Sequence, residues 1–185
     1  STEAGTNNSA IVGTNDKPVV IEMNGLDLNI GTSASGKNAQ AHGIVADGAD
    51  VTINNAGNIT IEASATGENG TASAIYANGN DVVIDNAENK GTVELKADSK
   101  VDGVAVLHAQ NNANVNITGK VDITNTNGNV AVSVGEGSTV AIGGGVIGDK
   151  ATSENEDNVA IHVDGGKLSI NANGDETVVI NGKIV

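Results

Sequence analysis

Acidic residues are the most numerous groups in this 185-residue chain that could do chemistry. Two sets of them fall in short polar stretches that predict turns, namely Asp47 and Asp50, and Glu154, Glu156 and Asp157. Hydrolysis of a glycosidic bond would need two carboxylates on opposite sides of a cleft. Nothing in the spacing of these acids sets two of them opposite each other, and acids in turns ordinarily bond nearby backbone amides and face solvent. We therefore expect no catalysis.

Metal binding is the second chemistry to weigh. The chain has three histidines, His42, His108 and His162, which fall in different copies of the repeat described below. The alternation of its strands predicts that His108 points inward and His162 outward, whereas a zinc site needs ligands that converge. We interpret all three histidines as structural. Calcium prefers carboxylate ligands, so the acids at 154–157 are the alternative metal site in a chain expected to hold no cofactor.

The net charge excludes several kinds of partner. Nine Lys+Arg against 23 Asp+Glu leave a formal charge of −14, and all nine basic residues are lysines. Binding to nucleic acid needs clustered cations, so nucleic acid is not expected as a partner, and an anionic membrane surface would repel the chain. No apolar stretch approaches the roughly 18 residues that span a bilayer, so direct membrane insertion is not expected. The absence of cysteine fits export through an oxidising compartment.

A repeat of close to 30 residues organises these groups along the chain. Each copy begins with a small residue followed by Ile or Val, at Ala10-Ile11, Gly43-Ile44, Ala74-Ile75, Ala105-Val106, Ala131-Val132 and Ala160-Ile161. Three short apolar runs follow within each copy, as in AHGIVADGADVTINNAGNITI at 41–61, separated by turns of Gly, Asn and Asp. The runs are too short for amphipathic helices, and the turns are too short for crossover helices.

The repeat therefore predicts an all-β fold, a single-stranded parallel β-helix, or solenoid, of about six three-strand coils. Each strand would pair with its equivalent one coil away. The interior must be filled by Val, Ile, Leu and Ala, because the chain has no Phe or Trp. We expect one domain over residues 1–185, cut from a longer surface protein, with residues 1–8 as a polar segment or cap.

The first strand of each coil predicts a binding face. Alternation with a period of two places Ile44 and Ile75 inward and leaves an outward row of Val12, Val45, Tyr76 and Leu107. Apolar side chains that lie together on a surface are usually covered by a partner. The longer insertions of the repeat fall between the third strand and the next coil, beside this row, where repeat proteins often carry binding loops.

Coils such as AIYANGNDVVIDNAENKGTVEL at 74–95 resemble the passenger domains of Gram-negative autotransporters, the exported part of type V secretion systems. The resemblance covers Ala10 to Val185 and is carried by the pattern of the coils and by the low content of Cys and Arg. It implies a right-handed parallel β-helix that is exported across the outer membrane to the cell surface. The membrane barrel of that family, and the protease head that some members carry, are missing from this sequence.

The resemblance and the outward row together predict a non-enzymatic surface adhesin or aggregation module. It would bind a protein or glycan on host or neighbouring cells through the first-strand face and its loops, and self-association is a further expectation. A passive spacer that holds a distal tip away from the cell is one alternative. A polysaccharide-degrading enzyme is the other, because parallel β-helices also serve lyases and hydrolases, although the lyases use basic residues and this chain has no Arg.

Overall fold

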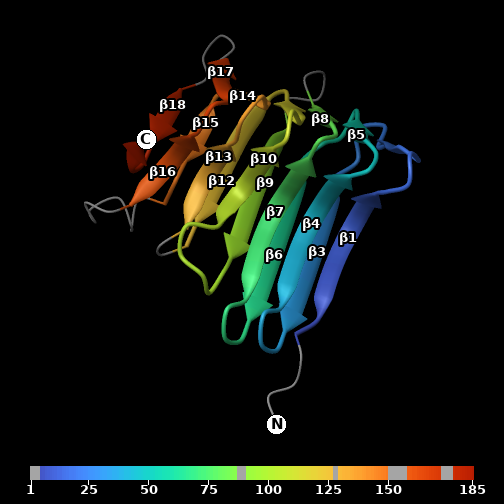
Figure 1. Ribbon diagram of the computed structural model, residues 1–185. Coiled ribbons are helices and arrows are strands. Elements are labelled where there is room, and N and C mark those ends of the chain that lie inside the picture. The colour runs from blue at the N-terminus through green and yellow to red at the C-terminus, as the bar shows by residue number, and fades with distance from the viewer. Residues whose placement is uncertain (1–4, 87–90, 127–128, 150–157, 172–176) are drawn as a thin grey trace.

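The computed structural model describes residues 5–86, 91–126, 129–149, 158–171 and 177–185. Within these ranges every regular element is a β-strand, and the strands form three parallel sheets that wind as a solenoid (Figure 1). The fold predicted from the repeat is confirmed. No helix able to cross a membrane occurs in this part of the chain.

The three strands of each coil go to three different sheets. Sheet 1 contains, in order, β1 (Asn7–Gly13), β4 (Gln40–Asp47), β7 (Thr71–Asn78), β10 (Ala105–Gln110), β13 (Val130–Val134), β16 (Val159–Val163) and β19 (Lys183–Ile184). Sheet 2 contains β2 (Val19–Glu22), β5 (Val51–Asn54), β8 (Val82–Asp85), β11 (Asn114–Ile117), β14 (Thr139–Gly143) and β17 (Lys167–Asn171). Sheet 3 contains β3 (Leu28–Ser35), β6 (Ile59–Thr66), β9 (Thr92–Asp98), β12 (Lys120–Asn125), β15 (Gly145–Ile147) and β18 (Val178–Ile180).

Equivalent aliphatic side chains stack from coil to coil in the interior. In sheet 2, Ile53 pairs with Ile21 on one side and with Ile84 on the other. Ile44 in sheet 1 and Ile61 in sheet 3 pair with their equivalents in the same way. All three of these central residues are fully buried, and burial of each such side chain contributes about 1.5–3 kcal/mol.

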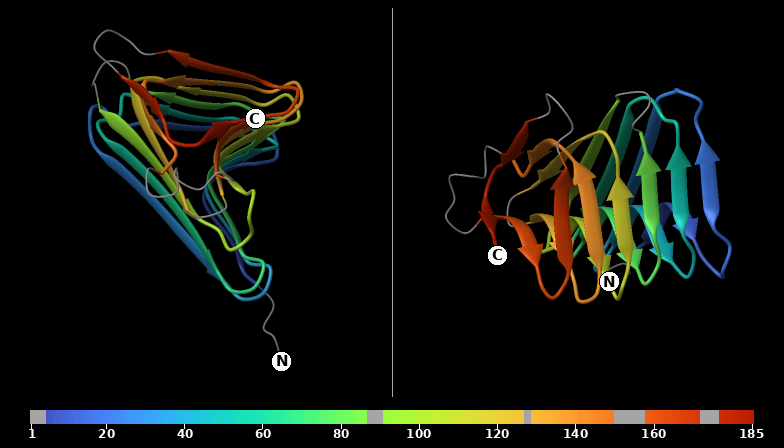
Figure 2. Two further views of the ribbon diagram at one scale, coloured as in Figure 1. Left: turned by 90° about the vertical axis from the view of Figure 1, so that its left-hand side faces the viewer. Right: turned by 90° about the horizontal axis from the view of Figure 1, so that it is seen from above.

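Sheets 1 and 3 meet at an acute edge in the first three coils, where their strands are longest. Figure 2 (left) shows this edge near the N-terminus, with the three sheets forming the sides of a triangle. The interior narrows there, and buried alanines such as Ala41, Ala63, Ala65 and Ala72 fill it. Small side chains let the two sheets approach closely, which accounts for the scarcity of bulky residues in the sequence.

Sheet 1 bends part-way along its strands, because two consecutive residues of each long strand point inward. In β4 these are Gly43 and Ile44, and a Cβ on Gly43 would strike the side chain of Ile61 inside the solenoid. His42 and Val45 therefore both lie on the outer face. A break of this kind in the two-residue alternation turns a strand, as a bulge does. It makes the outer face of sheet 1 concave, as the left panel of Figure 2 shows.

Because of this break, several first-strand residues do not point the way that strict alternation predicts. Gly43 and Ala74, like Ala131 and Ala160, are expected outward by strict alternation, but all four are buried. Strict alternation fails here because the first strand crosses a corner of the cross-section rather than one flat side.

The outward position predicted for Leu107 is wrong. Leu107 pairs with Ile75 and with Val132, and it is fully buried in the core. The fourth coil is therefore anchored on Val106-Leu107, one residue later than the sequence predicts, and His108 takes the outer position next to Tyr76. Ala105, Val106 and Leu107 are all apolar, so a pattern of apolar residues cannot detect a slip of one residue among them.

Candidate binding groove

The concave outer face of sheet 1 contains a groove with a volume of about 500 Å³, within the range of small-ligand sites. Its floor comes from β1, β4, β7 and β10, and the loop between β9 and β10 closes one end. In Figure 1 this loop is the yellow-green segment beside β7. The lining residues are Ser9, Gln40, His42, Val45, Asp47, Thr71, Ser73, Tyr76, Gly103, Val104 and His108.

Three rings stack along the floor of this groove. The ring centroid of Tyr76 lies 5.2 Å from that of His42 and 5.6 Å from that of His108, with interplanar angles of 31° and 24°. Tyr76 and His108 are register partners in neighbouring strands, so the spacing of the coils sets their separation. A histidine lies against each face of the tyrosine ring. The edge and the hydroxyl of Tyr76, and not a face of its ring, are therefore open to the groove.

This arrangement corrects the prediction for the histidines. His108 points outward, not inward, because of the one-residue shift of its coil, and His42 reaches the same face because of the break at Gly43. His162 lies further along sheet 1 and is exposed. No group of three potential metal ligands forms among the residues that the structure describes.

A chain of hydrogen-bonded side-chain amides connects Asp47 to the ring stack. The Asp47 carboxylate decides which atom of each amide donates and which accepts. The carboxylate can only accept, so Asn78 donates from Nδ2 to Asp47 Oδ1 at 3.0 Å and turns its own Oδ1 toward Gln110. Gln110 accordingly points Nε2 at Asn78 Oδ1, 3.5 Å away, and at the Tyr76 hydroxyl, 2.7 Å away. Its Oε1 lies 3.0 Å from His108 Nε2, which must carry the proton and donate.

The chain of amides fixes the hydrogen-bonding role of Tyr76. Its oxygen accepts a hydrogen bond from Gln110, and no hydrogen bond donated by the hydroxyl is found in the described part of the chain, so the O–H is free to donate to a ligand in the groove that Tyr76 lines. Burial, followed by the negative charge of Asp47, raises the pKa of Tyr76 above its ordinary value of 10.0, outweighing the hydrogen bond from Gln110. Tyr76 is therefore protonated and able to donate at neutral pH.

His42 is held in its neutral form. Its Nδ1 is buried and has no hydrogen-bond partner among the described residues. Burial, and secondarily the nearby His108, lowers the pKa of His42 below its ordinary value of 6.5. A buried ring nitrogen without a partner carries a desolvation cost in either tautomer, so Nδ1 of the neutral ring is left as an unsatisfied polar atom.

The lowered pKa of His42 makes stability depend on pH. The folded chain binds this proton less readily than the unfolded chain, so the free energy of unfolding should fall as the pH drops through 6.5 and stop falling below the folded pKa. We expect His42→Gln to lose less stability than wild type between about pH 7.5 and about pH 5 in urea unfolding. His162→Gln, an exposed histidine on the same sheet, is the control. Equal losses in His42→Gln and wild type would contradict this assignment.

The remaining predicted site residues separate into three groups. Val45 lies in the groove floor with 9% of its surface exposed, while Val12 lies on the first strand with 39% exposed. Asp50 accepts a hydrogen bond from the backbone N–H of Asp81 at 2.8 Å, the turn role expected for it. The proposed calcium ligands at 154–157, Glu154, Glu156 and Asp157, lie outside the described residues.

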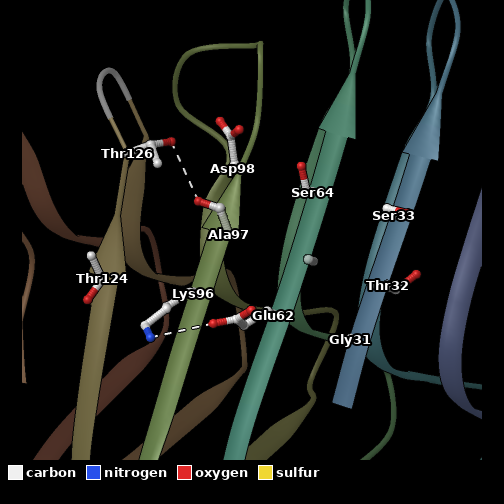
Figure 3. Close-up of a pocket in the computed structure, with 11 residues that line it drawn as sticks. Gly31, Thr32, Ser33, Glu62, Ser64, Lys96, Ala97, Asp98, Thr124 and Thr126 are labelled. Carbon is white, nitrogen blue, oxygen red and sulfur yellow. Dashed lines mark hydrogen bonds and ion pairs between the residues drawn. The ribbon is translucent and has the colours of Figure 1, made fainter. Parts of the chain in front are cut away.

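A second hollow, of about 460 Å³, crosses the outer face of sheet 3 (Figure 3). Small residues such as Gly31, Ser33 and Ser64 line it, and Lys96 joins Glu62 at 3.5 Å and Glu94 at 3.0 Å. These ion pairs are exposed, and such pairs contribute about 0–1 kcal/mol. The sheet 1 groove is the better candidate, because its donors and acceptors are held in defined directions.

Comparison with known proteins finds no family model, no curated protein and no solved structure that matches this chain significantly.

Proposed function

We propose that this chain is a non-enzymatic binding module of a bacterial cell-surface adhesin, and that it holds its ligand in the sheet 1 groove. The observation that carries the proposal is the network from Asp47 through Gln110 to Tyr76 and His108, which directs polar groups into a concave surface. Export to the surface of a Gram-negative bacterium is supported by the resemblance of the coils to autotransporter passengers.

The groove suits binding because it is organised before a ligand arrives. Its polar side chains project from paired strands, and Gln110 already bonds two of them. Ligand binding would then require little ordering of side chains, which ordinarily costs about 0.5–1.5 kcal/mol for each one immobilised. Val45 and Tyr76 of the predicted row line this groove together with His42 and His108, whereas Leu107 is buried in the core.

Adhesion should depend on the ring stack. We expect a Tyr76→Ala, His108→Ala double variant to bind fixed epithelial cells and bacterial cells at least about tenfold more weakly than wild type, because it removes two groups of the groove. Fluorescently labelled protein and flow cytometry would measure the binding, with circular dichroism as a check on the fold. His162→Ala, on the same sheet outside the groove, should bind as wild type does.

A passive spacer is the alternative that the solenoid itself supports, since parallel coils stacked in register make a stiff rod. A spacer would bind neither kind of cell. Absence of binding would therefore exclude the groove as an adhesive site, and so would equal binding with and without the ring stack.

A further inference from the structure

We infer that the ligand of the sheet 1 groove is an uncharged oligosaccharide. This inference rests on the proposed binding function and names the class of ligand. It follows from the charge, the hydrogen-bonding pattern and the shape of the groove.

The charge of the groove disfavours an anionic ligand. Among the described residues no lysine lines it and Asp47 is the one formally charged lining residue, and the whole chain carries −14. Acidic sugars, phosphates and carboxylates would therefore meet a repulsive field without a cation to offset it. The Asp47 carboxylate accepts a hydrogen bond from Asn78 through Oδ1 and thereby orients the network.

The hydrogen-bonding pattern fits hydroxyl groups. Tyr76 offers its hydroxyl, the neutral ring of His42 carries one N–H donor and one acceptor nitrogen, and His108 donates from Nε2 to Gln110. The three rings are 5.2 and 5.6 Å apart, and the hydroxyls of Thr71 and Ser73 lie beside them. A sugar presents neighbouring hydroxyls that each donate and accept, so it can satisfy a mixed row of this kind.

The shape of the groove disfavours the usual ways of binding a peptide. Strand addition needs a sheet edge, helix binding needs a wide apolar groove, and polyproline binding needs open aromatic faces. This groove lies on the face of a sheet, and both faces of the Tyr76 ring are flanked by histidines. Val45 and Val104 are the two aliphatic side chains among the described lining residues.

The direct test uses an array of immobilised neutral and acidic oligosaccharides, followed by calorimetry on the neutral sugars that bind. Wild type should bind neutral members and not purely acidic ones. Tyr76→Phe removes only the hydroxyl and should weaken binding about tenfold, the loss expected for one hydrogen bond to a ligand. Ser133→Ala, a hydroxyl deletion in the next coil outside the groove, should bind as wild type does.

A second measurement separates this inference from the proposed function. Periodate oxidation under conditions strong enough to cleave the ring diols of neutral sugars should abolish binding of the protein to fixed cells, whereas mild oxidation, which mainly cleaves the exocyclic diols of acidic sialic acids, should not. If binding depends on the ring stack but survives the stronger oxidation, the groove is adhesive and its ligand is not a glycan. Binding only to acidic sugars, or equal affinity of Tyr76→Phe and wild type, would overturn the inference. Absence of binding to both cells and array would overturn both proposals.

Discussion

Leu107→Ala should lower the free energy of unfolding by about 2–5 kcal/mol, the range for truncating a buried leucine to alanine. Leu107 is fully buried between Ile75 and Val132 of the neighbouring coils, so removing its side chain leaves a cavity in the stacked core. The measurement distinguishes a buried Leu107 from an outward one, because an outward leucine would tolerate replacement by alanine. Urea unfolding followed by circular dichroism measures it as a shift of the midpoint.

His108→Ala is the matched control for Leu107→Ala. The two residues are adjacent in β10 and point to opposite sides of sheet 1. Loss of His108 removes one hydrogen bond and one ring contact at a half-exposed position, so we expect a cost of about 1 kcal/mol. Equal midpoints for the two variants, or a lower midpoint for His108→Ala, would show that Leu107 is not a core residue.

Gly143→Ala should destabilise the chain by about 3 kcal/mol, the upper end of the range for overpacking. A Cβ at this position, the last residue of β14, would collide with the backbone carbonyl oxygen of Gly119 in the coil before it. The struck atom belongs to the backbone, so no side chain can rotate away. The two coils would have to separate, which strains the pairing of β11 with β14.

Gly31→Ala provides the comparison for the glycine prediction. Gly31 also lies in a strand, but a Cβ added there meets no atom within 4 Å, and its φ is not positive. Alanine at such a position is expected to stabilise by about 0.4–1 kcal/mol, because it restricts the unfolded chain. Urea midpoints of the two variants should therefore move in opposite directions. The steric account of Gly143 fails if both variants unfold at the wild-type midpoint.

The fold could be predicted because its signal is local and repeated. Short alternating runs predict strands, Gly and Asn predict turns, and the interval near 30 residues predicts stacking. In the second strands the recurring isoleucines Ile21, Ile53 and Ile84 are register partners. Each of these inferences needs only the residues of one coil and their recurrence in the next.

The groove could be predicted only in part. Val45 and Tyr76 lie in it as expected, but Leu107 does not, and neither His42 nor His108 was predicted there. The strand ends offered a usable signal. Aligning Ala77-Asn78 with Ala109-Gln110 would have placed His108 beside Tyr76, because the polar residue that closes each first strand marks its end better than a run of apolar residues.

The sequence alone determined the strands, the turns and the parallel stacking, because each of these depends on alternation and on turn residues within a single coil. Only the tertiary structure decided which outward side chains meet. Asp47, Asn78 and Gln110 form a directed network because three coils stack in one register, and His42 stacks on Tyr76 because sheet 1 bends at Gly43. Register between coils is a relation between residues 23 to 34 positions apart. A slip of one residue turns every side chain of the strand to the opposite face, while the number of apolar residues in the strand hardly changes.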